Sequence, residues 1–182
     1  MEGQGSGRKK TTAPRRREDM IKVEAKDGVE LAVKVIFGDD FGLDVGLLEA
    51  VVDTADVPAL AEAVRPIRYN YFDGSRVAEA LLKLHDEGCI MRVDFGREMS
   101  PVLYIHVPYW TNQATNCSNP YRGNRRLSEE ERKGIVARVM EELSKCQPDE
   151  LDALDIDKES LRWVRLPRSQ WGETDKIRAW WD

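Results

Sequence analysis

Residues 1–18 include no large apolar side chain except Met1, so they cannot contribute to a hydrophobic core. The segment is rich in small and polar residues and carries six cations: Arg8, Lys9, Lys10, Arg15, Arg16 and Arg17. Glu2 and Glu18 reduce its net charge to +4, and because the whole chain carries −5, the remainder over 19–182 carries −9. We therefore expect a disordered cationic arm over 1–18, followed by an acidic single domain over 19–182.

The composition supports this division. Of the 182 residues, 41% are hydrophobic, which is enough for a core without disulfide or metal staples. The sequence has neither an apolar run long enough to span a bilayer nor an apolar stretch after the basic N-terminus, so we expect no membrane span and no secretory signal. Three cysteines at wide spacing favour a reducing compartment, so an intracellular protein, cytoplasmic or nuclear, is expected.

The arm has two basic clusters, over 8–10 and 15–17, that suit nucleic-acid phosphates or another anionic partner. A nuclear-import receptor could also recognise them, and a solubilising tail without a specific partner is the third interpretation. The sequence alone leaves these three alternatives open.

A second basic segment lies further along the chain, because no acidic residue occurs between Glu98 and Glu129. Within it we expect a long polar loop over 109–127. Guanidinium groups bind phosphates and aromatic rings stack on bases. The candidate nucleic-acid contacts of the loop, within 109–126, are Tyr109, Trp110, Tyr121, Arg122, Arg125 and Arg126. The alternative is a surface loop whose aromatic side chains pack back onto the core.

The tail over 165–182 is rich in tryptophan. Trp171, Trp180 and Trp181 are candidate anchors for a protein partner, and docking of the tail on the core is the alternative.

Hydrophobic periodicity predicts an α+β fold with two β-hairpins and about five helices. The first hairpin is expected over 20–37, with Asp27-Gly28 at its turn. The second has strands over 89–95 and 102–107 and a turn over 96–101. Helices are expected over 44–54, from Asp56 to Val64, over 73–88 and from Ser128 to near Cys146, with short helical turns over 149–154 and 158–164.

The order of three helices and a hairpin over 44–107 resembles a winged-helix module. The resemblance rests on the run Leu81-Leu82-x-Leu84-x-x-x-Gly88-x-Ile90 and the strand, turn and strand that follow, ending at Tyr104. It implies that helix 73–88 would enter a DNA groove. That helix carries a net charge of −2, so phosphates would repel it, and a structural or protein-binding module is expected instead.

The sequence offers little for catalysis. His106 could act as a base for Cys117, with Asn112 or Asn116 orienting it, but no local nucleophile motif supports this arrangement. We therefore expect no catalytic residue, no metal site and no cofactor.

Three functions remain open. The first is a non-catalytic subunit of a ribosomal, transcriptional or viral nucleoprotein assembly, which contacts RNA or DNA through the arm and the loop and proteins through its acidic body. The second is a protein–protein adaptor or regulator whose arm serves localisation or solubility. The third is an enzyme that uses the 106–126 region.

Overall fold

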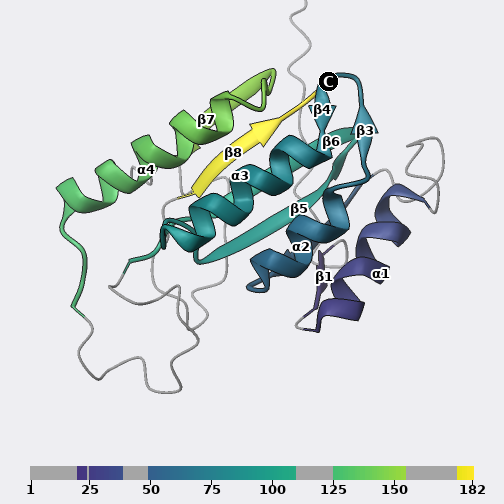
Figure 1. Cartoon of the computed structure of the whole chain (residues 1–182), viewed down its shortest axis with the longest axis horizontal. Coiled ribbons are helices and arrows are strands. Elements are labelled where there is room, and N and C mark those ends of the chain that lie inside the picture. The colour runs from purple at the N-terminus through teal and green to yellow at the C-terminus, as the bar shows by residue number, and fades with distance from the viewer. Residues whose placement is uncertain (1–19, 24, 39–48, 110–124, 155–175) are drawn as a thin grey trace, which may run out of the picture.

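The computed structural model describes residues 20–23, 25–38, 49–109, 125–154 and 176–182. Four helices and eight strands lie in this part of the chain (Figure 1). The helices are α1 (Lys26–Phe37), α2 (Val57–Val64), α3 (Gly74–Asp86) and α4 (Glu129–Ser144). The strands are β1 (Met20–Lys22), β2 (Glu49–Thr54), β3 (Arg68–Tyr69), β4 (Phe72–Asp73), β5 (Arg92–Glu98), β6 (Ser100–His106), β7 (Glu150–Leu154) and β8 (Lys176–Trp180).

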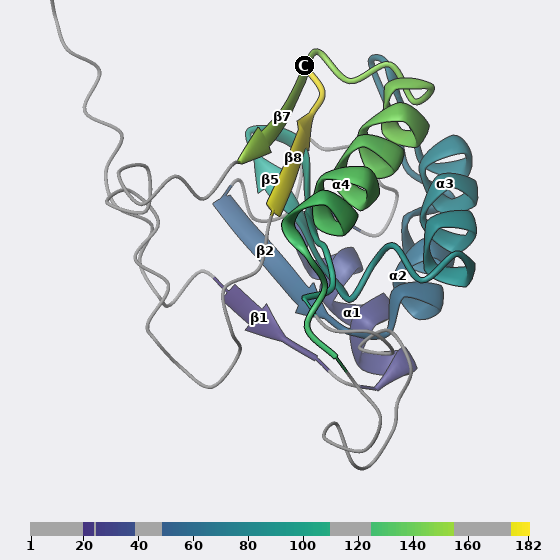
Figure 2. The ribbon, with the colours of Figure 1, turned by 90° about the vertical axis from the view of Figure 1, so that its left-hand side faces the viewer.

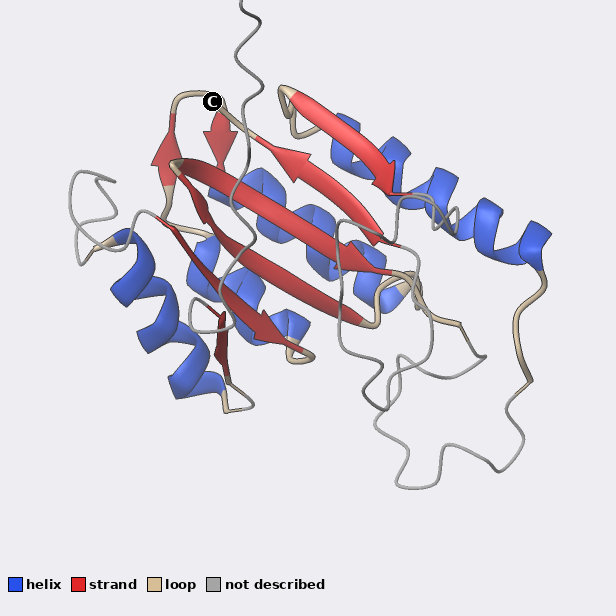
Figure 3. Ribbon diagram, turned by 180° about the vertical axis from the view of Figure 1, so that it is seen from behind, coloured by secondary structure: helices blue, strands red, loops and turns tan. Residues whose placement is uncertain are grey.

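Six of the strands form one sheet in the order β1-β2-β5-β6-β8-β7, and β3 and β4 form a separate small hairpin. β1 is parallel to β2, whereas the other neighbours are antiparallel. Figure 2 shows all four helices on one face of the sheet, and Figure 3 shows the opposite face. The described residues therefore form a two-layer α+β domain.

The core lies between the sheet and the helices. One row of paired strand positions there is fully or nearly fully buried and consists of Val52, Phe95, Leu103 and Ala179. Phe95 stacks on Phe37 of α1 and on Phe72 of β4, with ring centroids 5.1 and 5.7 Å apart. Residues from all four helices belong to this one cluster, so the described elements share a single core.

Local signals fix the starts of three helices, as the sequence predicts. The Asp56 side chain caps α2 by accepting from the Ala59 N–H, and Asp73 caps α3 by accepting from the Ser75 N–H at 2.9 Å. Ser128 and Glu131 form a reciprocal capping box at the start of α4. Gly88, with a φ of 71°, follows the end of α3.

The predicted hairpin over 20–37 is wrong, because 26–37 is helix α1. The alternating valines that suggest a strand coincide with a helical stripe. Val29, Ala32, Val33, Ile36 and Phe37 face the core at helical spacing, and Asp27-Gly28 lies in the first turn of the helix. Packing against the sheet decides between the two periods.

The helix predicted over 44–54 is also wrong in its described part, since 49–54 is strand β2, paired on both sides. The helical turn predicted over 149–154 is strand β7. The second hairpin is present but tighter than expected, because its strands extend through 96–98 and 100–101 and Met99 alone makes the turn.

The winged-helix resemblance is not confirmed, because the position of its first helix is occupied by β2. The expected turns over 158–164 lie outside the described residues. Among the described residues, no helix has the length and apolar character needed to cross a bilayer.

Candidate functional site

The polar loop expected over 109–127 is closed at its base. The Leu127 N–H donates to the Tyr109 carbonyl with an N···O distance of 2.9 Å. The two described ends of this segment, 109 and 125–127, therefore lie together between β6 and α4. This hydrogen bond brings two parts of the acid-free segment together.

Cationic side chains gather around Tyr109 at this base. The guanidinium carbons of Arg126 and Arg132 lie 5.0 and 4.3 Å from the centroid of its ring. Both distances are typical of cation–π contacts. Tyr109 is itself buried, so it acts as a support on which the two arginines rest.

Arg125 lies beside this platform and makes a two-pronged ion pair with Glu131. The hydrogen bonds from Arg125 and from the Ser128 N–H lower the pKa of Glu131 to about 2. Glu131 is therefore ionised at neutral pH and compensates the charge of Arg125. Arg126 and Arg132 place two further guanidinium groups over the ring of Tyr109.

The structure places only some of the predicted contacts. Arg126 lies over the ring of Tyr109, and Arg125 precedes it in the chain, but Tyr109 is buried, so its ring is not on the surface as a stacking platform for a base would be. Trp110, Tyr121 and Arg122 lie outside the described residues, as do Trp171 and the six cations of the arm: Arg8, Lys9, Lys10, Arg15, Arg16 and Arg17.

The two described tryptophans of the tail differ in how deeply they are buried. Trp181 is fully buried, meets Phe72 edge-on at a centroid distance of 5.0 Å, and donates from Nε1 to the Cys146 carbonyl at 3.0 Å. Its ring is part of the core and does not reach the surface where a partner would meet it, so docking is the alternative that the structure shows for Trp181. Trp180 is half-buried on the opposite face of β8, with Arg178 over its ring.

A second polar cluster lies on the sheet face away from the helices. His106 Nε2 is 3.0 Å from Asp94 Oδ2, and the Lys176 ammonium is 3.5 Å from the same oxygen. Asp53 of β2 pairs with Arg92 and lies opposite Asp94 in the strand register. Asp53, Asp94 and His106 are each more than nine-tenths buried.

The pKa values of the two carboxylates in this cluster are shifted in opposite directions. Burial raises the pKa of Asp53, and the hydrogen bond from Arg92 offsets this only in part. Burial also acts to raise the pKa of Asp94, but its hydrogen bond to His106 and the Lys176 ammonium outweigh burial, so the pKa of Asp94 falls below 3.8. Asp94 is thus held ionised, as required for a buried ion-pair cluster.

Sequence reasoning missed this cluster, although alternation places Asp94 and His106 on the polar side of their hairpin. The sequence does not reveal that β2 and β8 flank the hairpin and bring Asp53 and Lys176 to this side. Cys117, Asn112 and Asn116 lie outside the described residues, and Nε2 of His106 lies against Asp94. Among the described residues, no three ligating side chains are arranged to hold a metal ion.

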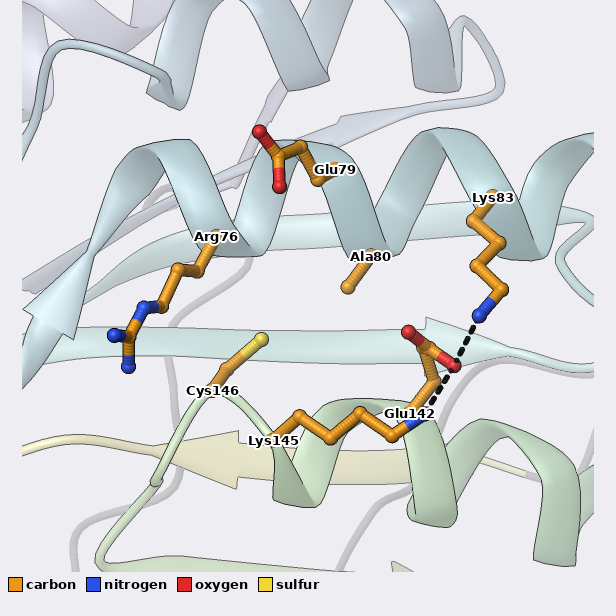
Figure 4. A pocket seen from close by; sticks show the side chains of 7 residues that line it. All are labelled: Arg76, Glu79, Ala80, Lys83, Glu142, Lys145 and Cys146. Carbon is orange, nitrogen blue, oxygen red and sulfur yellow. Dashed lines mark hydrogen bonds and ion pairs between the residues drawn. The ribbon is translucent and has the colours of Figure 1, made fainter.

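A third feature is a groove of about 350 Å³ between α3 and α4 (Figure 4). Glu142 Oε2 accepts at 2.9 Å from each of three cations, which are Lys83, Arg138 and Lys145. Figure 4 shows Ala80 and Cys146 between this ion cluster and Arg76. Burial raises the pKa of the Cys146 thiol to about 11, so the thiol stays protonated. The cluster ties the two helices together.

We expect Glu142→Gln to lower the free energy of unfolding by about 1–2 kcal/mol at neutral pH, because one carboxylate serves three cations. The hydrogen bonds from Lys145 and Lys83 lower the pKa of Glu142 from 4.5 to about 2. A lowered pKa stabilises the fold above pH 4.5, and this contribution disappears as the pH falls toward about 2. Urea denaturation at several pH values measures the difference.

Glu141→Gln is the matched control for this experiment. Glu141 is the preceding residue, its side chain is 65% exposed, and it lies 3.6 and 3.8 Å from Arg138 and Lys145. We expect it to change stability by less than about 0.5 kcal/mol. Equal losses in the two variants would contradict a special role for Glu142.

Comparison with protein-family models, with curated proteins and with solved structures finds no match. What this chain binds must therefore be inferred from its own residues.

Proposed function

We propose that the chain is a non-catalytic component of a nucleoprotein assembly, and that it contacts the RNA or DNA backbone through the arm (1–18) and the loop (109–126). The observation that carries this proposal is the separation of charge along the chain. A net charge of +4 lies in the arm, and the acid-free segment between Glu98 and Glu129 contains Arg122, Arg125 and Arg126. Both segments suit phosphates.

The geometry at the loop base supports the proposal. Arg126 is exposed and rests on Tyr109, which reduces the conformational freedom it would lose on binding phosphate. The closed base brings Arg125 and Arg126 close to Tyr109, where the predicted loop begins. The contacts would be to phosphates and base faces, so binding would depend on salt and depend little on sequence.

The acidic body, residues 19–182, is proposed to contact the protein partners of the assembly. With a net charge of −9 outside the arm, it would be repelled by nucleic acid and suited to protein partners with basic surfaces. The described cysteines, Cys89 and Cys146, are buried and not disulfide-bonded, and the wide spacing of the three cysteines in the sequence favours a reducing cytoplasmic or nuclear compartment.

Binding of labelled single-stranded RNA and DNA, followed by fluorescence anisotropy at low salt, tests the loop. We expect Arg125→Ala combined with Arg126→Ala to weaken binding roughly tenfold, because the Arg126 guanidinium is lost and the Glu131 carboxylate is left beside the phosphates without the cation that pairs with it. The control combines Arg65→Ala with Arg76→Ala, which removes the same charge from side chains of the body that are 36% and 60% exposed.

The control variant should bind within about twofold of the natural chain. Equal affinities for the natural chain and the loop variant would contradict the loop assignment. If the natural chain binds neither RNA nor DNA at low salt, the nucleoprotein proposal fails and the adaptor function takes its place.

A further inference from the structure

Ser128 lies where the basic segment of the chain meets α4. Two arginines, Arg125 and Arg126, stand three and two positions before it in the sequence. The serine and both arginines are exposed. Ser128 therefore presents an accessible hydroxyl directly after a pair of exposed guanidinium groups.

The backbone at Ser128 is extended. Its φ and ψ are −68° and 167°, and α4 begins only at the next residue, Glu129. Phosphoryl transfer requires the attacking oxygen to lie in line with the leaving oxygen, so a serine that accepts a phosphate must be open on one side. A hydroxyl on exposed, extended backbone meets this requirement better than a hydroxyl inside a helix.

We propose that Ser128 is a phosphorylation site for a serine kinase that recognises arginines two and three residues before its target. Kinases select substrates partly by their charge pattern, and a guanidinium group pairs with a carboxylate in a fixed two-pronged geometry. In the reaction, Ser128 Oγ forms a bond to the γ-phosphorus of ATP, and the bond from this phosphorus to the ADP oxygen breaks. The hydroxyl proton passes to the base of the kinase.

Both arginines are placed so that a kinase can reach them. Arg125 already makes a two-pronged pair with a carboxylate, that of Glu131, and the Arg125 side chain is 61% exposed. An exposed ion pair of this kind contributes little net free energy, so a kinase carboxylate can replace Glu131. Arg126 rests on the ring of Tyr109, which limits its conformational freedom before binding.

The phosphate on Ser128 would lie among cations. The Arg132 N–H donates to the Ser128 carbonyl at 3.1 Å, and the Arg132 guanidinium carbon lies 4.3 Å from the Tyr109 ring centroid. Residues four apart lie on the same side of a helix, so Arg132 is a neighbour of Ser128. A phosphate adds a charge of about −1.5 to −2 and three acceptor oxygens, which can pair with arginines on either side.

The acids at the start of α4 oppose this charge only in part. Glu129 is ion-paired with Lys133 at 2.6 Å, and Glu131 is ion-paired with Arg125. Residues 125–133 hold four cations and three acids, a net charge of +1. The phosphate would make this net charge negative, so phosphorylation would remove the positive charge of the loop base.

The consequence for binding rests on the proposed function. If the loop base contacts nucleic acid, a phosphate on Ser128 competes with the nucleic-acid phosphates for the same arginines. Phosphorylation would then release the chain from RNA or DNA. We expect the affinity at low salt to fall at least about tenfold.

Incubation of the full chain with ATP, Mg²⁺ and a purified arginine-directed serine kinase tests the modification by itself. Mass spectrometry of the digested chain should find phosphate on Ser128. Arg125→Ala combined with Arg126→Ala should slow its transfer at least about tenfold. A natural chain that stays unmodified at Ser128, or an arginine variant that is modified as fast, would overturn the proposal.

Ser144 is the matched control within the same helix. It is an exposed serine at the end of α4, and Glu141 and Glu142 stand three and two positions before it. An arginine-directed kinase should leave Ser144 unmodified. Equal transfer to Ser128 and Ser144 would contradict recognition through the arginines.

Fluorescence anisotropy with labelled single-stranded RNA and DNA tests the effect on binding. The phosphorylated chain should bind at least about tenfold more weakly than the unmodified chain. Ser128→Ala treated with the same kinase should bind like its untreated form. Equal binding by the phosphorylated and unmodified natural chain would overturn the regulation. An unmodified chain that binds neither nucleic acid would contradict the proposed function and this regulation together, whereas phosphate found on Ser128 would still support the modification site.

Discussion

Replacing Trp181 with alanine is expected to lower the free energy of unfolding by about 3–5 kcal/mol, the range for deleting a fully buried large aromatic side chain. Trp181 is 0% exposed and packs edge-on against Phe72, which stacks on Phe95. The substitution also leaves the Cys146 carbonyl without the indole donor that binds it at 3.0 Å. Urea denaturation followed by circular dichroism measures the loss.

Two further variants show how much of that loss comes from the hydrogen bond and how much from burial of the ring. Trp181→Phe keeps much of the ring and removes the hydrogen bond, so we expect it to lose about half as much stability. Trp180→Ala truncates the neighbouring, half-buried tryptophan on the other face of β8 and should cost less than about 2 kcal/mol. Equal losses at Trp180 and Trp181 would contradict the docked tail.

Replacing Asp94 with asparagine is expected to cost about 3 kcal/mol at neutral pH, because it breaks a buried ion pair while preserving shape. The Lys176 side chain is only 12% exposed, and its ammonium would lose the carboxylate that lies 3.5 Å away. The His106 ring would lose a charged partner at 3.0 Å. Relief of the repulsion between Asp94 and Asp53 offsets part of this cost.

The difference between the natural chain and Asp94→Asn should depend on pH. Because the pKa of Asp94 is lowered by folding, its carboxylate stabilises the fold above the ordinary value of 3.8, and this contribution is lost as the pH falls below that value. Asp53, whose pKa is raised, has the opposite sign, since its ionisation costs stability as the pH rises. The stability gap should therefore narrow below about pH 4.

Glu150→Gln is the control for Asp94→Asn. Glu150 pairs with Arg178 on the same sheet face, but its side chain is 54% exposed. We expect a change below about 1 kcal/mol there. A loss at Asp94 as small as that at Glu150 would show that the Asp94 cluster is not a stabilising ion-pair network.

The elements that the sequence predicts correctly carry their own signals. Helices α2, α3 and α4 are capped by Asp56, Asp73 and Ser128, whose side chains accept hydrogen bonds from backbone N–H groups of the first turn. Such caps act within a single helical turn, so they can be recognised without the tertiary structure. The β5–β6 hairpin can be recognised in the same way, because its two strands follow each other in the sequence and pair with each other.

The elements that were missed depend on distant partners. In α1, Val29 and Val33 satisfy both a strand pattern and a helix pattern, and only packing of the helix on the sheet selects the helix. β2 pairs with β5, from which α2, the β3–β4 hairpin and α3 separate it along the chain. No local feature of 49–54 reveals that pairing.

Strand β8 is a different case, because its alternation is visible in the sequence. Ile177, Ala179 and Trp181 are buried, while Lys176 and Arg178 face the other side. The tryptophan content of 165–182 suggests a docked or partner-binding tail, and the same residues also satisfy the period-two pattern of a strand. The same strand supplies Lys176 to the Asp94 cluster, so missing the strand also concealed the cluster.

The dependence of nucleic-acid affinity on salt tests the proposed function most directly. For single strands, each phosphate contact adds about 0.7 to the slope of log K against log salt concentration. If the six cations of the arm contact phosphates, deleting 1–18 should weaken binding at low salt and make that slope shallower by about 4. An affinity and a slope that are unchanged by the deletion would contradict the proposal.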